Sequence, residues 1–194
     1  MGIRFAWGSI VLLAALAMVF FFCAVAKGDA PTLADRIAVL VPRYASKKTE
    51  PVAATELASA IDSACKHDRE CAARLLTMAV MESGLSAAVS RSEYTEHQGD
   101  AYTDRDGVRQ HLAWGTFQQH KNARNAADWG NDDLTVQARH ARAIQAGALA
   151  ECRKFRGVDP EVAMWRILSG RGCMVKFSGE DARQVLLRKI RKAL

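Results

Sequence analysis

The chain has 194 residues, of which 49% are hydrophobic and 25% charged, and Lys plus Arg exceed Asp plus Glu by 27 to 21, a net charge of +6. This length suffices for one domain of ordinary size with a short appendage, and it is too short for two large domains. The composition excludes a collagen, a low-complexity tract and a highly charged disordered chain. The positive surplus suits nucleic acid, an anionic membrane or an anionic wall polymer, and it does not choose among them.

An uncharged hydrophobic segment, residues 5–26, lies between Arg4 and Lys27. Its length is enough for a helix to cross a bilayer, which takes about 20 apolar residues. The segment ends in Ala-Val-Ala at residues 24–26, the small-x-small pattern that signal peptidase accepts. This pattern favours cleavage, whereas the length and three phenylalanines at residues 20–22 favour an uncleaved signal anchor. A cleaved signal peptide and an anchor therefore both stay open. Either one predicts an exported protein, periplasmic or anchored in the inner membrane and facing the periplasm.

Four of the five cysteines lie after this segment, since Cys23 belongs to it. In an oxidising compartment we expect these four to form disulfides, for which three pairings exist. We predict Cys65–Cys71 and Cys152–Cys173, because each pair brackets a connection between predicted helices. A zinc site is the lower-ranked alternative, since the usual C-x₂-C spacing is absent.

The exported part is predicted to be mainly α, with an α+β arrangement left open. Residues 28–50 are predicted to be a linker with a short helix, capped by Thr32 and Asp35 and ending near Pro42. Helical spacing begins after Pro51. It leads to a largely buried helix that stops at a Ser-Gly pair, residues 83–84, and whose dense apolar band is Leu75, Leu76, Met78, Ala79 and Met81.

Residues 85–131 are predicted to be loops with a small β-hairpin, and three further helices are expected after them. One runs from Leu134 to about Phe155 after capping candidates at residues 132–133. The next begins at Asp159-Pro160 and stops at Ser169-Gly170. The last is opened by Ser178 with Asp181, and in it we expect Val185, Leu186 and Ile190 to face inward and Arg188, Lys189, Arg191 and Lys192 to face solvent, with membrane attraction as a weaker alternative.

Glu82 stands at the end of the core-facing helix, directly after the apolar run of residues 77–81. A charge in that place is costly unless it is paired, and partial desolvation raises the pKa of a carboxyl group. A carboxylic acid that keeps its proton at the edge of a cleft is what protonation of a glycosidic oxygen requires. The burial pattern alone favours the simpler alternative, an ordinary half-exposed glutamate at a helix end.

Two further motifs follow Glu82-Ser83-Gly84 in order, Ala-Trp-Gly-Thr-Phe-Gln at residues 113–118 and Ser-Gly-Arg-Gly at residues 169–172. Together they resemble the lysozyme-like lytic transglycosylases of the soluble-lytic-transglycosylase type. In that family Glu-Ser-Gly ends the catalytic helix, an Ala-x-Gly-Leu-Met-Gln segment follows, and an Ala-Tyr-Asn-Ala-Gly segment comes later. The resemblance covers residues 52–175 or so. It implies that Glu82 is the catalytic residue, and that substrate is held by Gly115 and Gln118, with Ser83, Trp114 and Phe117 beside them.

The chain also departs from the family pattern. Thr116 and Phe117 replace Leu-Met, and the spacing from Glu82 to the second motif is longer than usual, which indicates an insertion at residues 92–111. The family's active-site tyrosine has no clear match, because Ile-Leu-Ser-Gly at residues 167–170 occupies that place and Trp165 is two positions away.

The resemblance implies a mechanism with one acid. Glu82 protonates the leaving oxygen and then, as carboxylate, takes the proton of the sugar's own 6-hydroxyl, which closes a 1,6-anhydro ring. A hydrolase would need a second carboxylate. The candidates for it lie in the insertion, where each by itself is better explained as part of a solvated acidic loop: Glu93, Asp100, Asp104 and Asp106.

Other chemistries have less support. The histidines show no HExxH spacing, a G-x-S-x-G elbow is missing, and no nucleic-acid-binding motif occurs. A loop metal site built from His97 and His111 with Asp100 or Asp104 ranks low, so we predict neither metal nor cofactor. Several aromatic side chains flank the predicted cleft and either stack on sugars or pack a small lobe: Tyr94, Tyr102, Trp114, Phe117 and Trp129.

The sequence therefore predicts a signal peptide or anchor at residues 1–27, a linker at 28–50 and a mainly α, lysozyme-like domain at 51–194, with residues 90–131 roofing a cleft. The predicted function is cleavage of the β-1,4 bond between N-acetylmuramic acid and N-acetylglucosamine in peptidoglycan. The alternative is an inactive lysozyme-like module that binds glycan or a protein. The expected partners are peptidoglycan and, through residues 5–26 if uncleaved, the inner membrane; no nucleic acid is expected, and the protein is expected to be a monomer.

Overall fold

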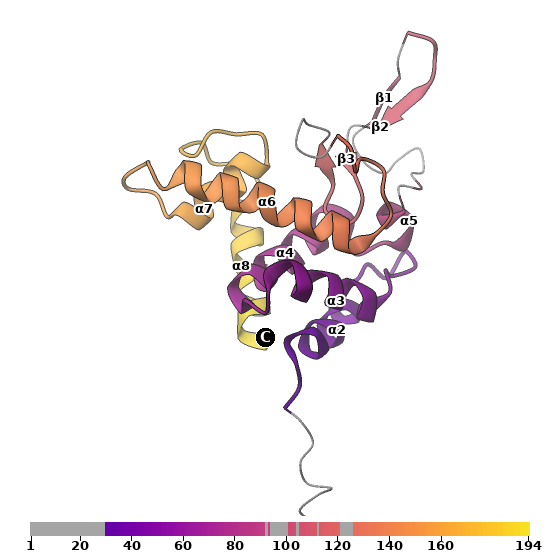
Figure 1. Cartoon of the computed structure of the whole chain (residues 1–194). Coiled ribbons are helices and arrows are strands. Elements are labelled where there is room, and N and C mark those ends of the chain that lie inside the picture. The colour runs from indigo at the N-terminus through magenta and orange to yellow at the C-terminus, as the bar shows by residue number, and fades with distance from the viewer. Residues whose placement is uncertain (1–29, 92, 94–100, 104, 112, 121–125) are drawn as a thin grey trace, which may run out of the picture. The chain divides into compact units, whose positions relative to one another are not determined.

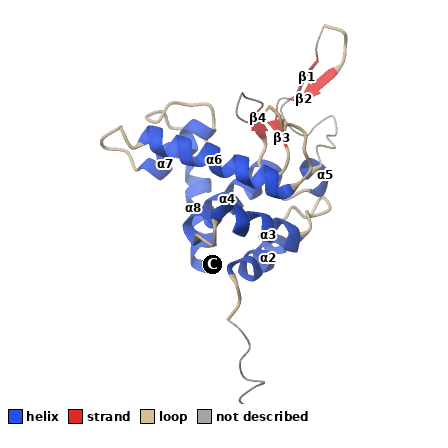
Figure 2. Ribbon diagram, in the orientation of Figure 1, coloured by secondary structure: helices blue, strands red, loops and turns tan. Residues whose placement is uncertain are grey.

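A computed structural model of the chain describes residues 30–91, 93, 101–103, 105–111, 113–120 and 126–194. Their helices and strands belong to one unit, residues 32–194. This unit is mainly α, as predicted (Figures 1 and 2). Its elements are α2 (Leu33–Tyr44), α3 (Ala54–Cys65), α4 (Arg69–Ser83), α5 (Ala87–Ser90), β1 (Ala101–Thr103), β2 (Arg109–His111), β3 (Ala113–Trp114), β4 (Gln119–His120), α6 (Leu134–Cys152), α7 (Pro160–Leu168) and α8 (Glu180–Ala193).

Helix α2 begins with the predicted capping box, in which the Thr32 side chain accepts from the Asp35 backbone and the Asp35 carboxylate accepts from Thr32 in return. The helix continues two residues beyond the expected stop at Pro42. A proline in the last turn removes only one backbone donor, and buried Leu40 and Val41 hold that turn against α3. Residues 33–44 are therefore part of the helical core, where the sequence suggested a short helix within a linker.

Helix α4 runs through the core and packs against α2, α3, α6 and α8. It begins at Arg69, and its N-cap is Asp68, whose carboxylate accepts from the Cys71 backbone N–H at 2.8 Å. The predicted apolar band is buried except for Met81, whose exposed fraction is 36%. The last turn of the helix therefore leaves the core and reaches solvent one residue before Glu82.

The starts of α6 and α7 are capped by Asp133 and Asp159, as predicted, with Pro160 in the first turn of α7. Helix α6 ends at Cys152, slightly earlier than expected. The four predicted cysteines form two disulfides, Cys65–Cys71 and Cys152–Cys173, which excludes a zinc site made from them. The first closes the α3–α4 connection, whereas the second encloses all of α7. Two disulfides are typical of a chain that folds in an oxidising compartment.

Helix α8 differs from expectation in two ways. Its N-cap is Gly179, in the left-handed region at φ 94°, and Ser178 makes no side-chain cap. The inward face is set by Leu187 and Ile190, while Val185 is 41% exposed. The pattern of apolar residues admits either phase of the helix, and packing against α4 and α7 selects the one that buries Leu187.

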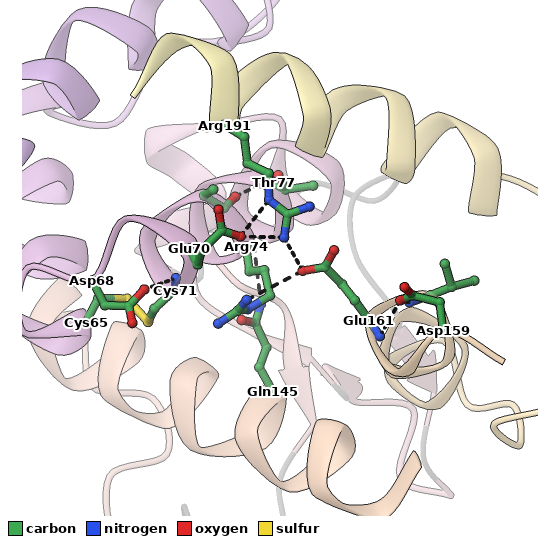
Figure 3. Close-up of polar contacts among 12 residues, drawn as sticks. Cys65, Asp68, Glu70, Cys71, Arg74, Thr77, Gln145, Asp159, Glu161 and Arg191 are labelled. Atoms are coloured by element: carbon green, nitrogen blue, oxygen red, sulfur yellow. Dashed lines mark hydrogen bonds and ion pairs between the residues drawn. A yellow bond between two sulfur atoms is a disulfide. The ribbon is translucent and has the colours of Figure 1, made fainter. Parts of the chain in front are cut away.

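The basic side of α8 is not uniformly solvated. Figure 3 shows Arg191 reaching from α8 to two carboxylates, Glu70 of α4 and Glu161 of α7, at 2.6 and 2.5 Å. Glu161 also lies 3.5 Å from Arg74 of α4. Burial lowers the pKa of Arg191, but the hydrogen bonds and the charge attraction of the two carboxylates together outweigh it and raise that pKa. The prediction that Arg191 faces solvent was therefore wrong, because its guanidinium pairs with carboxylates on two other helices. Arg188, Lys189 and Lys192 are exposed, as expected.

Two small antiparallel hairpins occupy the region predicted to hold one. Strand β1 pairs with β2, and β3 pairs with β4. Figure 1 shows the β1–β2 hairpin extending beyond the end of the helical body at which α5 and β3 lie. No helix among the described residues is long and apolar enough to cross a membrane; residues 5–26, for which a signal peptide or anchor is predicted, lie outside them.

Candidate active site

The end of α4 is held in place by a turn. Gly84 has φ 59° and caps the helix, as predicted, and Leu85 follows at φ 58° with its side chain buried. The backbone of this turn bonds to the preceding chain, where Ser46 N–H donates to Gly84 and Val52 N–H donates to Leu85. Glu82 therefore projects from a helix end that backbone hydrogen bonds tie to the preceding chain at Ser46 and at Val52.

The second motif forms the turn of the β3–β4 hairpin. Gly115 and Gln118 both have positive φ, 68° and 45°, and Gln118 donates to the Gly115 carbonyl from its backbone at 3.1 Å and from its side chain at 2.9 Å. A Cβ at Gly115 would lie 2.4 Å from the Oε1 atom of Gln137. Glycine is therefore required at this position by both the backbone conformation and a close neighbour.

Gln137 of α6 anchors that turn. Its Oε1 accepts from the Thr116 backbone at 2.8 Å, and its Nε2 donates to the carbonyls of Ser90 and Asn131. The side chain is completely buried and its polar atoms are satisfied. Sequence reasoning missed Gln137. A single glutamine in a helical pattern gives no sign that its side chain binds a turn 21 residues earlier in the chain.

One cavity of about 680 Å³ brings the three motif segments together. Glu82 enters it from the end of α4, Gln118 from the β3–β4 turn, and Ser169 with Gly170 from the end of α7. Met81, the exposed member of the α4 band, lies beside Glu82 in the wall. The remaining lining residues are Met78, Ala113, His120, Leu168, Phe177, Ser178, Gly179 and Arg183.

Glu82 is ion-paired within this cavity. Its Oε1 lies 2.7 Å from an Nη atom of Arg183, with 24% of the Glu82 side chain and 12% of the Arg183 side chain exposed. The guanidinium of Arg183 also lies over two rings, 5.7 Å from the centroid of Trp165 and 5.3 Å from that of Phe177. Such cation–π contacts add to the ion pair in holding the arginine in place.

Three predicted substrate-binding residues lie outside the cavity wall. Trp114 and Phe117 are buried, Trp114 against Trp129 at 5.6 Å between centroids and Phe117 in the main core. Ser83 donates to the Ala79 carbonyl at 2.8 Å and so stabilises the last turn of α4. Trp114 and Phe117 thus serve packing and Ser83 serves helix termination, and their role in substrate binding stays a prediction. Gly115 likewise acts through the turn conformation, and Gln118 is the second-motif side chain that the cavity exposes.

The candidates for a second carboxylate are placed in part. Glu93 is exposed and paired with Arg91 at 2.9 Å, and this hydrogen bond lowers the pKa of Glu93. Asp106 is exposed, and neither it nor Glu93 lines the cavity. Other predicted residues of the insertion lie outside the described residues or have only their backbone described: Tyr94, His97, Asp100, Tyr102, Asp104 and His111.

Arg183 is the main residue that sequence reasoning missed. It comes 101 residues after Glu82 and belongs to no motif; its position in the first turn of an amphipathic helix is typical of a solvated side chain. Trp165, noted only as a displaced match for a tyrosine, packs under the arginine.

The arrangement combines a carboxylate, a fixed cation and an amide around an open cavity, which suits acid–base chemistry on a neutral polar ligand. Among the described residues, no group of three or more metal-binding side chains lies close enough together to hold a metal ion. Comparisons with models of protein families, with curated proteins and with solved structures find no match for the chain.

Proposed function

We propose that this protein is an exported, lysozyme-like peptidoglycan-cleaving enzyme that cuts the β-1,4 bond between N-acetylmuramic acid and N-acetylglucosamine. The observation that carries the proposal is the convergence of three segments, far apart in the chain, on one cavity. These are the segments that resemble the lytic transglycosylase motifs, and Glu82 is the carboxyl group they surround. The two disulfides support an extracytoplasmic location, for which the periplasm is the proposed compartment.

Glu82 acts first as a general acid in this mechanism. It gives its proton to the glycosidic oxygen while the bond from that oxygen to C1 of N-acetylmuramic acid breaks, and N-acetylglucosamine leaves with a new 4-hydroxyl group. Positive charge develops at C1. A general acid is neutral before transfer, so Glu82 must carry a proton for this step while its Oε1 atom lies beside Arg183.

Ring closure completes the reaction. The 6-hydroxyl oxygen of the same muramic acid attacks C1, and the Glu82 carboxylate takes the hydroxyl proton, so that no water is consumed. Gln118, whose side chain lines the cavity, is proposed to hold the sugar. The transglycosylase route is the one proposed because the resemblance implies a mechanism with a single acid, and Glu82 lines the cavity as that acid.

The products test this assignment. The full chain, purified in detergent, is incubated with purified peptidoglycan, and the soluble fragments are identified by mass spectrometry. We expect fragments that end in 1,6-anhydro-N-acetylmuramic acid, one water lighter than hydrolysis products. Fragments carrying a reducing end would assign the hydrolytic reaction, and an absence of soluble fragments would contradict the enzymatic function.

A second candidate is a binding module that lacks activity. The observation that favours it is the Glu82–Arg183 ion pair, since a carboxylate committed to an arginine is also a common structural feature. This candidate predicts that the protein sediments with insoluble peptidoglycan and releases nothing from it. Sedimentation and release measured on the same sample distinguish the two functions.

A further inference from the structure

Two connections between helices are joined by a disulfide at one end of the molecule. Cys152 ends α6, and Cys173 lies in the connection from α7 to α8, with 5.6 Å between their Cα atoms. Figure 1 shows the connections on both sides of α7 near the C-terminal end of α6, away from β3. Residues 153–158 and 170–177 of these connections are called the paired-loop surface.

Exposed apolar side chains gather on the paired-loop surface. The described residues include seven large hydrophobic side chains that are well exposed, and three of them lie here. Phe155, Met174 and Val175 are 45%, 53% and 50% exposed. Their turns lie beside the disulfide, where Phe155 N–H donates to the Cys152 carbonyl at 3.1 Å and Val175 N–H donates to the Gly172 carbonyl at 2.9 Å. Apolar side chains exposed together in this way are typical of an interaction site.

The same surface carries an excess of positive charge. Its two segments contain five Lys and Arg residues and no Asp or Glu. All five are exposed: Arg153, Lys154, Arg156, Arg171 and Lys176. None of them forms an ion pair with a residue that the structure describes. Their charges are therefore available to an anionic partner.

The combination of apolar and basic side chains decides which partner this surface fits. An anionic wall polymer offers charge within a hydrated matrix, where Met174 and Val175 would stay in contact with water. Apolar side chains gain free energy when they leave water. A bilayer that contains anionic lipids satisfies both kinds of side chain, because its acyl chains receive the apolar groups and its phosphate groups attract the cations.

We propose that the paired-loop surface docks on an anionic lipid bilayer, with Phe155, Met174 and Val175 in the interface and the five cations at the lipid phosphates. The inference goes beyond the proposed enzymatic function, since these three apolar side chains do not line the cavity. The connection from α7 to α8 also lines the cavity, through Gly170 and Phe177. Docking therefore brings one rim of the cavity towards the bilayer.

Amide hydrogen exchange, measured by mass spectrometry on the full chain, tests the proposal. The chain is transferred from detergent to vesicles of equal parts phosphatidylglycerol and phosphatidylcholine, or of phosphatidylcholine alone. We expect the anionic vesicles to slow exchange in residues 153–158 and 170–177, and the neutral vesicles to do so much less. The readout is local, so attachment through residues 5–26 does not mimic it. Residues 47–48, an exposed turn of two lysines, are the internal control and should exchange equally in both.

A pair of charge variants measures the ionic contribution. Arg156→Gln with Arg171→Gln removes one cation from each loop. Each cation near an anionic surface strengthens binding about 5-fold, so the slowing of exchange should fall by up to about 30-fold. Arg188→Gln with Lys189→Gln makes matching changes at exposed cations of α8 outside the surface and should leave the slowing unchanged. An equal effect of both pairs would overturn the proposal, since attraction by total charge alone predicts that result.

The apolar contribution is tested by Phe155→Ser with Met174→Ser, which should abolish most of the slowing. Unchanged exchange of the two loops of the unaltered chain in anionic vesicles would overturn the proposal, as would slowing that this apolar variant retains in full. Slowing by purified peptidoglycan and not by vesicles would assign the surface to the wall polymer instead. Slowing without lipid that increases with protein concentration would assign it to a second copy of the chain, and either result would overturn the proposal.

Discussion

Two ion pairs meet at the start of α8, and they are built differently. Glu180 and Arg183 lie one turn apart on this helix; Glu180 pairs with Arg166 of α7, and Arg183 pairs with Glu82 of α4. The Arg166–Glu180 pair is doubly hydrogen-bonded, at 2.8 and 2.9 Å, and Arg166 also donates to the Cys173 carbonyl at 3.0 Å.

The two ion pairs also differ in how far they are exposed to solvent. Side-chain exposure is 6% for Arg166 and 10% for Glu180, against 12% for Arg183 and 24% for Glu82. The first pair is enclosed and its hydrogen bonds are used within the protein. The second opens on a cavity, and the Nη1 atom of Arg183 has no hydrogen-bond partner among the residues that the structure describes. The Arg166–Glu180 pair is therefore enclosed by the fold, whereas the Glu82 carboxyl group is accessible from the cavity.

The largest stability effect should come from the enclosed pair. Glu180→Gln leaves the Arg166 charge buried without its partner, and breaking a buried pair in this way costs about 3–5 kcal/mol. Urea unfolding should show this loss in the free energy of unfolding. Glu82→Gln is the matched control and should change the stability much less; an equal loss in both variants would refute the distinction between the pairs.

The same pair predicts how stability depends on pH. The hydrogen bonds from Arg166 hold the pKa of Glu180 below its usual range, although burial acts in the opposite direction. A lowered pKa in the folded state means that the stabilisation is complete above the ordinary glutamate pKa and is lost as the pH falls through the lowered value. Thermal unfolding should therefore show a decline below that ordinary pKa, and Glu180→Gln should reduce its steepness. A decline equally steep in the variant would contradict the assignment.

Removal of the two disulfides should also lower the free energy of unfolding by unequal amounts. Cys152–Cys173 closes the longer loop and holds the carbonyl to which Arg166 donates, whereas Cys65–Cys71 closes a short turn. Replacing both cysteines by serine should cost about 3 kcal/mol for the longer loop and about 2 kcal/mol for the shorter. Calorimetry of the two double variants measures the difference, and the reverse order would contradict the loop-length argument.

Gly115→Ala should destabilise the protein less than loss of the enclosed ion pair or of the longer disulfide loop, and it should act on the cavity side. The variant strains a backbone at φ 68° and presses on Gln137, at a cost of about 1–2 kcal/mol. Since this turn carries Gln118 into the cavity, fragment release should fall more than stability does. Gly107→Ala is the control, because this glycine also has positive φ but nothing within 4 Å of its Cβ position; equal losses of activity would remove the special role of the second-motif turn.

Much of the fold was predictable because its signals are local. The caps at Thr32, Asp133 and Asp159 and the stop at Gly84 each depend on residues within one helical turn. The phase of α8 was not predictable, because Val185 and Leu187 are both apolar and only packing separates them.

The residues of the candidate site were likewise predictable only where a local motif marks them. The three motifs identified the segments that line the cavity, including Glu82 and Gln118. Arg183 and Gln137 were missed, since each acts on a segment far away in the chain and no local pattern marks it. Burial also reassigned Trp114 to the interior, a choice that composition left open between stacking and packing.

The rate of fragment release from peptidoglycan by Glu82→Gln tests the central claim most directly. Glu151→Gln is the matched control, since it makes the same substitution at an exposed glutamate that does not line the cavity. We predict a rate about 100-fold to 10,000-fold lower for Glu82→Gln at unchanged thermal stability, the range expected for loss of a general acid, and an unchanged rate for Glu151→Gln. Equal rates for Glu82→Gln and the unaltered chain would contradict the account.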